Sequence, residues 1–214
     1  MNILFLYAHA DDESLGAGGT IQKWIAKGHA VQLITVSDGV LAKRKGGGDN
    51  RAAYAAACEE LGLEDFQLLG FPDQAFETVP VADVINAVSE VAKPFDLIVS
   101  HDSGDLNRDH RIVAEAARVL ARPRGRQVGL LTSEIPFSGA WNGKPFHPNF
   151  FVNIEEWLEV KQGAFSKYVG EVRGDTDPFS MEGLATLARF RGLESGCRYA
   201  EGFKIERWVE GFGI

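Results

Sequence analysis

Short runs of apolar residues alternate along the chain with longer segments that have a helical pattern. Most of the short runs are apolar at successive positions, which is typical of strands covered on both faces of a parallel sheet. The clearest helical segment begins at Arg51 and is rich in alanine, the strongest helix former. The predicted strands are Ile3–Ala8, Val31–Val36, Phe66–Leu69, Leu97–Ser100 and Val128–Thr132, and the predicted helices lie at about 14–27, 51–62, 80–93 and 110–121.

This alternation predicts an α/β fold, a Rossmann-like parallel sheet with helices on both faces. Beyond residue 150 the pattern predicts two more helices, Ile154–Tyr168 and Met181–Ser195, and a final strand within Tyr199–Trp208. No internal repeat or linker interrupts the chain, so we expect residues 1–214 to form a single domain. Three polar or glycine-rich stretches are expected to be loops, at 37–50, 70–79 and 133–149.

The composition is that of a globular protein, with 45% hydrophobic and 24% charged residues among 214. The net charge of −8 argues against a nucleic-acid partner, because phosphates would require a basic surface. Cys58 and Cys197 have no C-x-x-C neighbour, which argues against a disulfide framework or a zinc–thiolate site. The first residues lack the basic start of a signal peptide and no apolar run reaches membrane-spanning length, so we expect a cytoplasmic protein.

Two polar stretches follow predicted strands, "YAHADDESLGAGG" at 7–19 and "SHDSGDLNRDHRIVAEA" at 100–116. In the common strand order 3-2-1-4-5 the first and fourth strands are neighbours, so these two stretches should face each other at the carboxyl edge of the sheet. Together they carry three histidines and five aspartates. Imidazole and carboxylate groups are ligands that suit zinc, and a cation would relieve the repulsion between neighbouring acids.

Each of these residues, taken alone, also has a purely structural interpretation. Asp12 or Glu13 could cap the first helix, and Asp109 could cap the helix that follows it. His9 could be a hydrogen-bonded histidine without a metal. The joint presence of both clusters at two neighbouring strand ends favours the metal site.

The stretch His9-Ala10-Asp11-Asp12-Glu13 resembles the A-H-P-D-D-E signature of the LmbE-like (PIG-L) zinc-dependent N-deacetylases. Asp105-Leu106-Asn107-Arg108-Asp109-His110 is similar to the second motif of that family, which ends in Asp-His. The likeness extends to Leu69–Asp73, to "RGLESG" at 191–196 and to "AEGF" at 200–203. It therefore covers nearly the whole chain.

The resemblance implies that His9, Asp12 and His110 hold one zinc ion per chain and that Asp11 is the general base. Adjacent residues point their side chains apart, so Asp12 can hold the metal while Asp11 faces its water. A bound zinc ion lowers the pKa of that water to about 7, and a general base is typically worth about 10²–10⁴ in rate. The implied reaction removes the acetyl group from an N-acetylated amino sugar or sugar conjugate and releases acetate and a free amine.

Two residues depart from the family pattern. Ala10 stands where the family usually has proline, which would stiffen the turn. Asn107 stands where some members have a histidine that helps to polarise the substrate carbonyl. An asparagine amide can donate a hydrogen bond to an oxyanion but cannot carry a proton at neutral pH, so Asn107 is a candidate catalytic residue that leaves the acid–base chemistry to Asp11.

Further roles follow from the resemblance with alternatives left open. Asp109 and Glu13 could orient the ligands, or they could serve only as helix residues. Arg51 and Asp73 match positions that contact sugar hydroxyls in relatives, although the first could simply be solvated and the second a turn residue. Trp141 is the loop aromatic best placed in sequence to meet a sugar ring.

Other assignments remain open from sequence alone. The substrate could be a non-sugar N-acyl amide, or the fold could be a non-catalytic module that binds a cation or a ligand. The partner we expect is a small molecule, and whether the chain forms a homo-oligomer is left open. The glycines of Gly16-Ala17-Gly18-Gly19 do not fit a dinucleotide motif and instead predict close packing between helix and sheet.

Overall fold

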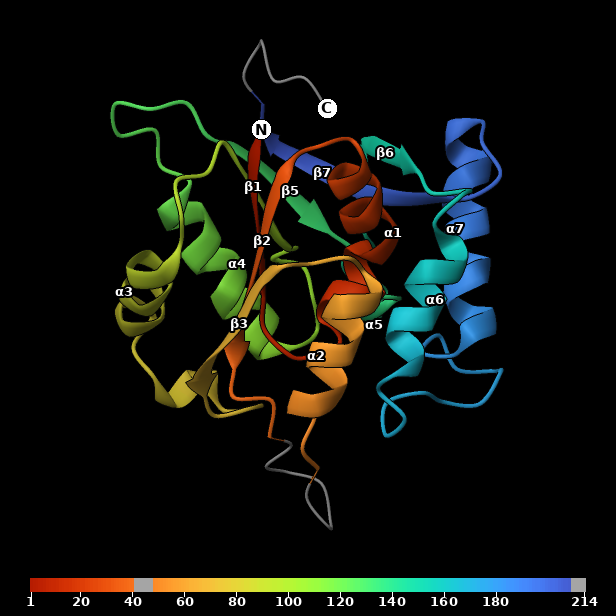
Figure 1. Ribbon diagram of the computed structural model, residues 1–214, viewed down its shortest axis with the longest axis horizontal. Coiled ribbons are helices and arrows are strands. Elements are labelled where there is room, and N and C mark those ends of the chain that lie inside the picture. Colours follow the sequence, from red (N-terminus) through yellow and green to blue (C-terminus); the bar gives the residue numbers. More distant parts are fainter. Residues whose placement is uncertain (41–47, 209–214) are drawn as a thin grey trace.

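A computed structural model describes residues 1–40 and 48–208, and within them the strands form one seven-stranded sheet of order β3-β2-β1-β4-β5-β7-β6 (Figure 1). The first five strands are parallel, as predicted, and include the predicted order 3-2-1-4-5. β7, for which the sequence analysis gave no direction, is antiparallel to both of its neighbours, so the sheet is mostly parallel with an antiparallel edge. The strands are β1 Asn2–Tyr7, β2 Ala30–Ser37, β3 Asp65–Phe71, β4 Leu97–His101, β5 Gly129–Ser133, β6 Phe150–Asn153 and β7 Ala200–Arg207.

The helices lie on both faces of the sheet, which confirms the predicted α/β architecture (Figure 1). α3 and α4 cover one face, and α1, α2, α6 and α7 lie on the other. The predicted helix at 154–168 is shorter, because its first residues form a turn before α6 begins. The helices are α1 Asp12–Ala26, α2 Arg51–Glu60, α3 Val81–Val91, α4 Arg108–Leu120, α5 Ser138–Trp141, α6 Leu158–Ser166 and α7 Met181–Ser195, with a 3-10 helix η1 at Phe76–Thr78.

The central strand β1 explains why the apolar runs are continuous. Its side chains alternate between two hydrophobic cores: Phe5 and Tyr7 face the core under α1, and Leu4 and Leu6 face the core under α4. Because a strand turns successive side chains to opposite faces, a strand covered on both sides is apolar at every position. Ile3–Tyr7 is accordingly buried throughout.

The register of β1 against β4 brings the two polar stretches together. Leu6 pairs with Ser100, so the residues that follow β1 lie beside His101 at the end of β4. The predicted loop at 37–50 falls partly outside the described residues. The carboxyl edge of the parallel strands is therefore the place where the predicted site assembles, as in other open α/β sheets.

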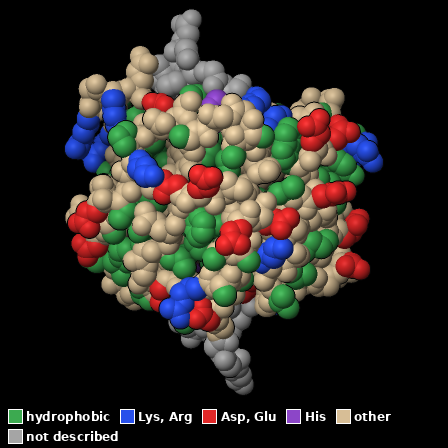
Figure 2. Space-filling view, in the orientation of Figure 1, with side chains coloured by type: hydrophobic (Ala, Val, Ile, Leu, Met, Phe, Trp, Pro, Cys, Tyr) green, Lys and Arg blue, Asp and Glu red, His purple; other side chains and the backbone are tan. Residues whose placement is uncertain are grey.

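Among the residues that the structure describes, no helix is both long enough and apolar enough to span a membrane. Figure 2 shows acidic and basic side chains interspersed over the face that it presents. The cytoplasmic location stays a prediction of the sequence, and the oligomeric state stays open.

Candidate metal centre

Three buried side chains converge where β1 and β4 end. His9 follows β1, Asp12 opens α1 and His110 lies in the first turn of α4. His9 Nδ1 lies 3.1 Å from His110 Nε2 and 3.6 Å from Asp12 Oδ2, and His110 Nε2 lies 3.4 Å from Asp12 Oδ1. One ligand atom from each residue falls within 4.8 Å of the others, which is close enough for a single cation.

Each imidazole is held from behind by a carboxylate. His9 Nε2 lies 3.0 Å from Asp109 Oδ2, and His110 Nδ1 lies 3.0 Å from Asp105 Oδ2. Asp109 also accepts a hydrogen bond from the backbone N–H of Phe76 through its other oxygen. This arrangement fixes the ring orientation and leaves the inner nitrogens, Nδ1 of His9 and Nε2 of His110, turned toward each other, as at many metal-binding histidines.

Asp105 is a functional candidate that the sequence analysis did not select. Its carboxylate accepts hydrogen bonds from the Ser138 hydroxyl and from the backbone N–H of Asn107, in addition to its contact with His110. Burial opposes ionisation, but the His110 imidazole outweighs it and lowers the pKa of Asp105. Its place as the first residue of the second motif was the one signal available in the sequence.

Asp11 has an unusual backbone conformation, with φ of 141° and ψ of −24°. Positive φ values are costly for residues other than glycine and persist where the surroundings enforce them, often at functional sites. The backbone N–H of Asp11 donates to Glu13 Oε2 at 3.1 Å, and Glu13 is itself fully buried and accepts from Tyr168 Oη at 2.8 Å. Asp11 is the N-cap residue of α1 by position but its side chain makes no capping bond, so its carboxylate is left to the cavity.

The pKa values of the two adjacent aspartates are shifted in opposite directions. Burial raises the pKa of Asp11 well above its usual range, and the negative charges of Asp12 and Glu171 add to that effect. Burial also opposes ionisation of Asp12, but the imidazoles of His110 and His101 hold its pKa well below the usual range. A ligand that stays ionised beside a carboxyl that readily takes up a proton is the division that metal-assisted hydrolysis requires.

The carboxylates around His9 raise the pKa of its imidazole. Burial alone would lower its pKa, but hydrogen bonds to Asp109 and Asp12 raise the pKa from 6.5 to about 10. A cation at the inner nitrogen would have to displace this proton, so metal uptake is coupled to pH.

His101, the last residue of β4, is fully buried beside the site. Its ring stacks on that of His110 with centroids 4.0 Å apart, and its Nε2 accepts the backbone N–H of Ala8 at 2.9 Å. Burial and the neighbouring His110 lower its pKa to about 4, so the ring is neutral and its proton resides on Nδ1. His101, Asp105 and His110 are also close together, but the Nε2 of His101 already accepts the N–H of Ala8.

Asn107 serves as the N-cap of α4. Its side-chain oxygen accepts the backbone N–H of Asp109 at 2.9 Å, and its Nδ2 donates to Gln74 Oε1 at 3.2 Å. Gln74 in turn lies 3.1 Å from His9 Nε2, so the loop after β3 closes over the same imidazole. The helix cap that the sequence offered as an alternative for Asp109 is therefore Asn107, and Asp109 contacts His9.

The two predicted sugar contacts lie in different surroundings. Asp73 is buried, lines the cavity and has its Oδ1 3.5 Å from His9 Nε2. Arg51 is exposed at the start of α2, where its Nε donates to Asp49 Oδ1 at 2.9 Å, and it is not among the residues that line the cavity. The structure thus brings Asp73, but not Arg51, to the group around His9.

A cavity of about 650 Å³ opens above this group. Its floor consists of the candidate ligands with Asp11, Asp73 and Asp109. The part of the chain after β5 also contributes to the lining, with both apolar and polar side chains. These residues, which we call the wall residues, are Ile135, Ser138, Trp141, Glu171 and Phe179.

Residues 4–121 match the family described as GlcNAc-PI de-N-acetylase, PIG-L. The chain belongs to this family. The predicted PIG-L membership is confirmed, and the matched residues include both motifs of the candidate metal centre.

Individual relatives place this PIG-L chain among proteins of the same fold. It is 27% identical to the diacetylchitobiose deacetylase of Thermococcus kodakarensis over 95% of this chain and 82% of the relative. A conserved protein of Thermus thermophilus has the same fold, with a TM-score of 0.77 and 23% identity over 99% of both chains. The 4-carboxy-2-hydroxymuconate hydratase of Pseudomonas putida KT2440 also shares it, with a TM-score of 0.73 and 20% identity over 100% of this chain and 99% of that one.

Proposed function

We propose that this PIG-L chain is a zinc-dependent hydrolase that removes the N-acetyl group from an N-acetylated amino sugar or sugar conjugate. The observation that carries the proposal is the convergence of His9 Nδ1, Asp12 and His110 Nε2 on the floor of a cavity that Asp11 also lines. Family membership and the deacetylase activity named for the Thermococcus relative support the same class of reaction.

The donor set fits zinc better than a cation that prefers oxygen. Two imidazole nitrogens and one carboxylate leave a coordination position open, which is characteristic of catalytic zinc sites. The carboxylates behind both histidines strengthen this fit, because they fix which nitrogen faces inward. Zinc bound by His9, Asp12 and His110 would supply Lewis acidity toward the amide carbonyl and the attacking water.

Asp11 is the residue that we propose moves the proton. Its carboxylate takes a proton from water as the water oxygen bonds to the acetyl carbon, and it returns the proton to nitrogen as the C–N bond breaks. Burial and the neighbouring Asp12 raise the pKa of Asp11, which makes its carboxylate a stronger base toward water than an ordinary aspartate. The products are acetate and a free amine.

Asn107 and Asp73 have supporting roles in this proposal. The Asn107 amide donates N–H groups beside the cavity and can stabilise the oxyanion, although it cannot protonate the amine. Asp73 lines the cavity, so its carboxylate can accept a hydrogen bond from a sugar hydroxyl. Arg51 would need to leave its contact with Asp49 to reach a substrate.

The fold alone does not decide the reaction, because a hydratase shares it. We therefore test hydrolysis directly, with N,N'-diacetylchitobiose and N-acetylglucosamine beside an N-acetylated amino alcohol that lacks a sugar ring. We expect acetate release from the sugars. Release from the acyclic amide alone would favour a non-sugar N-acyl substrate, and metal uptake without hydrolysis would favour a binding module.

The role of Asp11 has its own test. We expect about one zinc per chain by elemental analysis in both the wild type and Asp11→Asn, and a rate about 10²–10⁴ times lower in the variant. Asp83→Asn, an exposed aspartate in the first turn of α3, is the matched control and should retain full activity. Full activity of Asp11→Asn would refute the assignment of the base.

A further inference from the structure

Helix α1 is broken one turn after the ligand Asp12. Ala17 has φ of −151° and ψ of 16°, outside the helical region, so the first turn and the rest of the helix are separate segments. In a regular helix the N–H of Gly19 would donate to the carbonyl of Leu15. Here both groups bond elsewhere: Leu15 O accepts from Lys161 Nζ at 2.8 Å, and Gly19 N–H donates to Glu201 Oε1 at 3.1 Å.

The two groups that replace the helical bond are paired with each other. Lys161 Nζ lies 2.5 Å from Glu201 Oε1, and the other oxygen of Glu201 accepts the N–H of Thr20 at 2.7 Å. Lys161 belongs to α6 and Glu201 to β7, and both side chains are buried. A buried ion pair is costly unless further hydrogen bonds satisfy it, and here the broken backbone supplies them.

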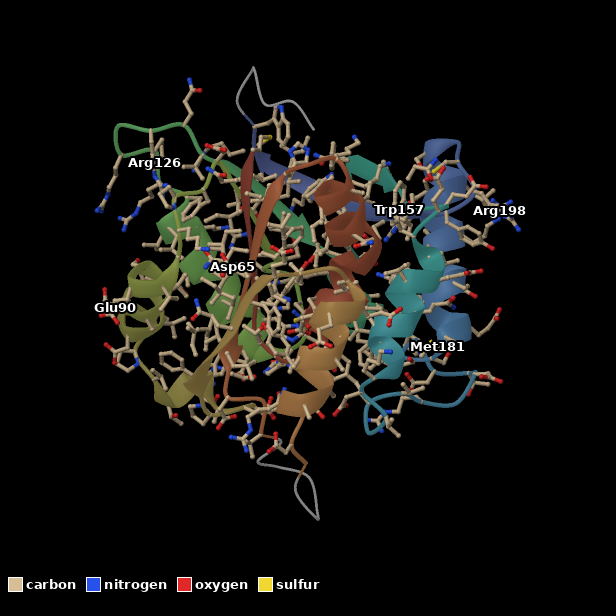
Figure 3. The ribbon with its side chains drawn as sticks, in the orientation of Figure 1. Asp65, Glu90, Arg126, Trp157, Met181 and Arg198 are labelled. Carbon is tan, nitrogen blue, oxygen red and sulfur yellow. The ribbon has the colours of Figure 1, made fainter. Side chains whose placement is uncertain are left out.

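The sequence around the break is adapted to this arrangement. A Cβ atom on Gly18 would lie 3.2 Å from Lys161 Cγ, and one on Gly19 would lie 2.8 Å from Ile154. Gly18 and Gly19 therefore admit α6 and the residues before it, and Gly16 packs closely against Ser133 of β5 and Tyr7 of β1, as the sequence analysis expected. Lys23, farther along α1, lies over the ring of Trp157 just before α6, with Nζ 5.4 Å from the ring centre. Trp157 is labelled in Figure 3.

We propose that Lys161 and Glu201 are positioning residues that hold the break in α1 and thereby fix the Asp11–Asp12 turn at the metal centre. The segment from Asp12 to the break is only about one turn long, so it has little stability of its own. Its far end is secured by the hydrogen bond that Lys161 Nζ donates to Leu15 O. This inference rests on the proposed function for its catalytic consequence, but its effect on the metal site can be measured without turnover.

The test compares this pair with a second buried ion pair. Lys161→Met and Glu201→Gln each remove one side of the pair that spans the break. Arg191→Met is the matched control, because Arg191 Nη2 lies 2.7 Å from Glu134 Oε2 in a buried pair whose described hydrogen bonds do not involve α1. All variants lose thermal stability for the same reason, since each leaves a charge unpaired.

The deciding readouts are metal affinity and the visible absorption of the cobalt-substituted protein, whose ligand-field bands report the geometry of the ligands. We expect Lys161→Met and Glu201→Gln to bind zinc at least about tenfold more weakly and to shift the cobalt bands, as for other residues that orient metal ligands. We expect kcat to fall more than KM rises. Arg191→Met should keep the wild-type affinity and spectrum.

Unchanged zinc affinity and cobalt bands in folded Lys161→Met would overturn the proposal. If that variant does not fold, Glu201→Asp keeps the charge but shortens the reach to Gly19 and Thr20, and the same readouts apply. Amide hydrogen exchange gives an independent check: zinc should slow exchange at Gly19 and Thr20 in the wild type but not in Glu201→Gln. If the wild type binds zinc but hydrolyses none of the substrates, the proposed function is refuted. The positioning role of Lys161 and Glu201 is still tested, because the metal-binding readouts need no substrate.

Discussion

The buried charges in the two halves of this protein are balanced in different ways. In residues 1–133 the carboxylates of Asp12, Asp105 and Asp109 converge on imidazoles, and their described partners are histidines, hydroxyls and backbone N–H groups. In residues 134–208 the half-buried Glu134 is paired with Arg191 and the buried Glu201 with Lys161, whereas the buried Glu171 lines the cavity near Asp11.

This difference separates two uses of buried charge. A closed ion pair with its hydrogen bonds satisfied can only hold structure in place, which is the role of the pairs in the second half. A cluster in which acids outnumber fixed cations retains the capacity to bind one. In our proposal the first half therefore supplies the metal ligands and the general base, and the second half supplies the support behind them and part of the cavity lining, including Glu171.

The largest change in zinc affinity is expected when a carboxylate behind one of the histidines is removed, and this change tests the comparison most directly. We expect Asp105→Asn and Asp109→Asn each to weaken zinc binding by about 10–100-fold, because the imidazole loses the acceptor that orients it. Zinc affinity measured by competition with a chelator checks this. Asp102→Asn is the control, since Asp102 bonds Thr132 and Gly104 and does not contact a candidate ligand. If Asp105→Asn and Asp109→Asn bind zinc as tightly as Asp102→Asn and the wild type, the two carboxylates serve the fold and not the metal.

A second effect is the pH dependence of metal uptake. Burial lowers the pKa of His9, but Asp109 and Asp12 raise it to about 10, so the cation-free site holds a proton that zinc must displace. Zinc binding should therefore strengthen as pH rises, by up to about tenfold per pH unit below that value. Affinity measured between pH ~6 and ~8 and proton release measured by calorimetry check this.

The variant Asp109→Asn sharpens the same measurement. It removes the hydrogen bond that contributes most to raising the pKa of His9, so proton release near neutral pH should decrease. A zinc affinity independent of pH in the wild type would show that His9 is already neutral in the cation-free site.

The sequence predicted the first half of the fold well because its signals are local. The continuous apolar runs and the intervening helices are each readable alone, and the shared carboxyl edge of parallel strands then places His9 beside His110. The second half depends on pairing between distant segments. β6 has only four residues, which lie between the predicted loop at 133–149 and the predicted helix from Ile154 and were not assigned, and nothing local reveals that β7 runs antiparallel between β5 and β6.

The candidate site shows the same division. His9, Asp12 and His110 are marked by motif spacing, whereas Asp105 gains its role only because the Nδ1 side of His110 faces it. Gln74 comes from a loop that bends back over His9 with φ of 54°, which no periodicity predicts. Long-range contacts of this kind lie beyond what residue patterns convey.

The smallest effect concerns the cavity wall in the second half. Trp141 at the end of α5 lines the cavity and is 57% exposed, so its ring contributes little to the packing of the core. We expect Trp141→Ala to raise KM about fivefold with kcat nearly unchanged, because a stacked sugar ring contributes about 1 kcal/mol of binding that does not differ between ground and transition states. Steady-state kinetics on N,N'-diacetylchitobiose measures this.

Phe190 in α7 provides the matched control for Trp141, since it is a comparably exposed aromatic that does not line the cavity. Phe190→Ala should leave both kinetic constants unchanged. If Trp141→Ala lowers kcat and leaves KM as it was, the second half takes part in the chemical step and the separation of chemistry from support drawn above is wrong. If neither constant changes, the sugar does not stack on this wall, and Phe179 on the same wall becomes the next ring to vary.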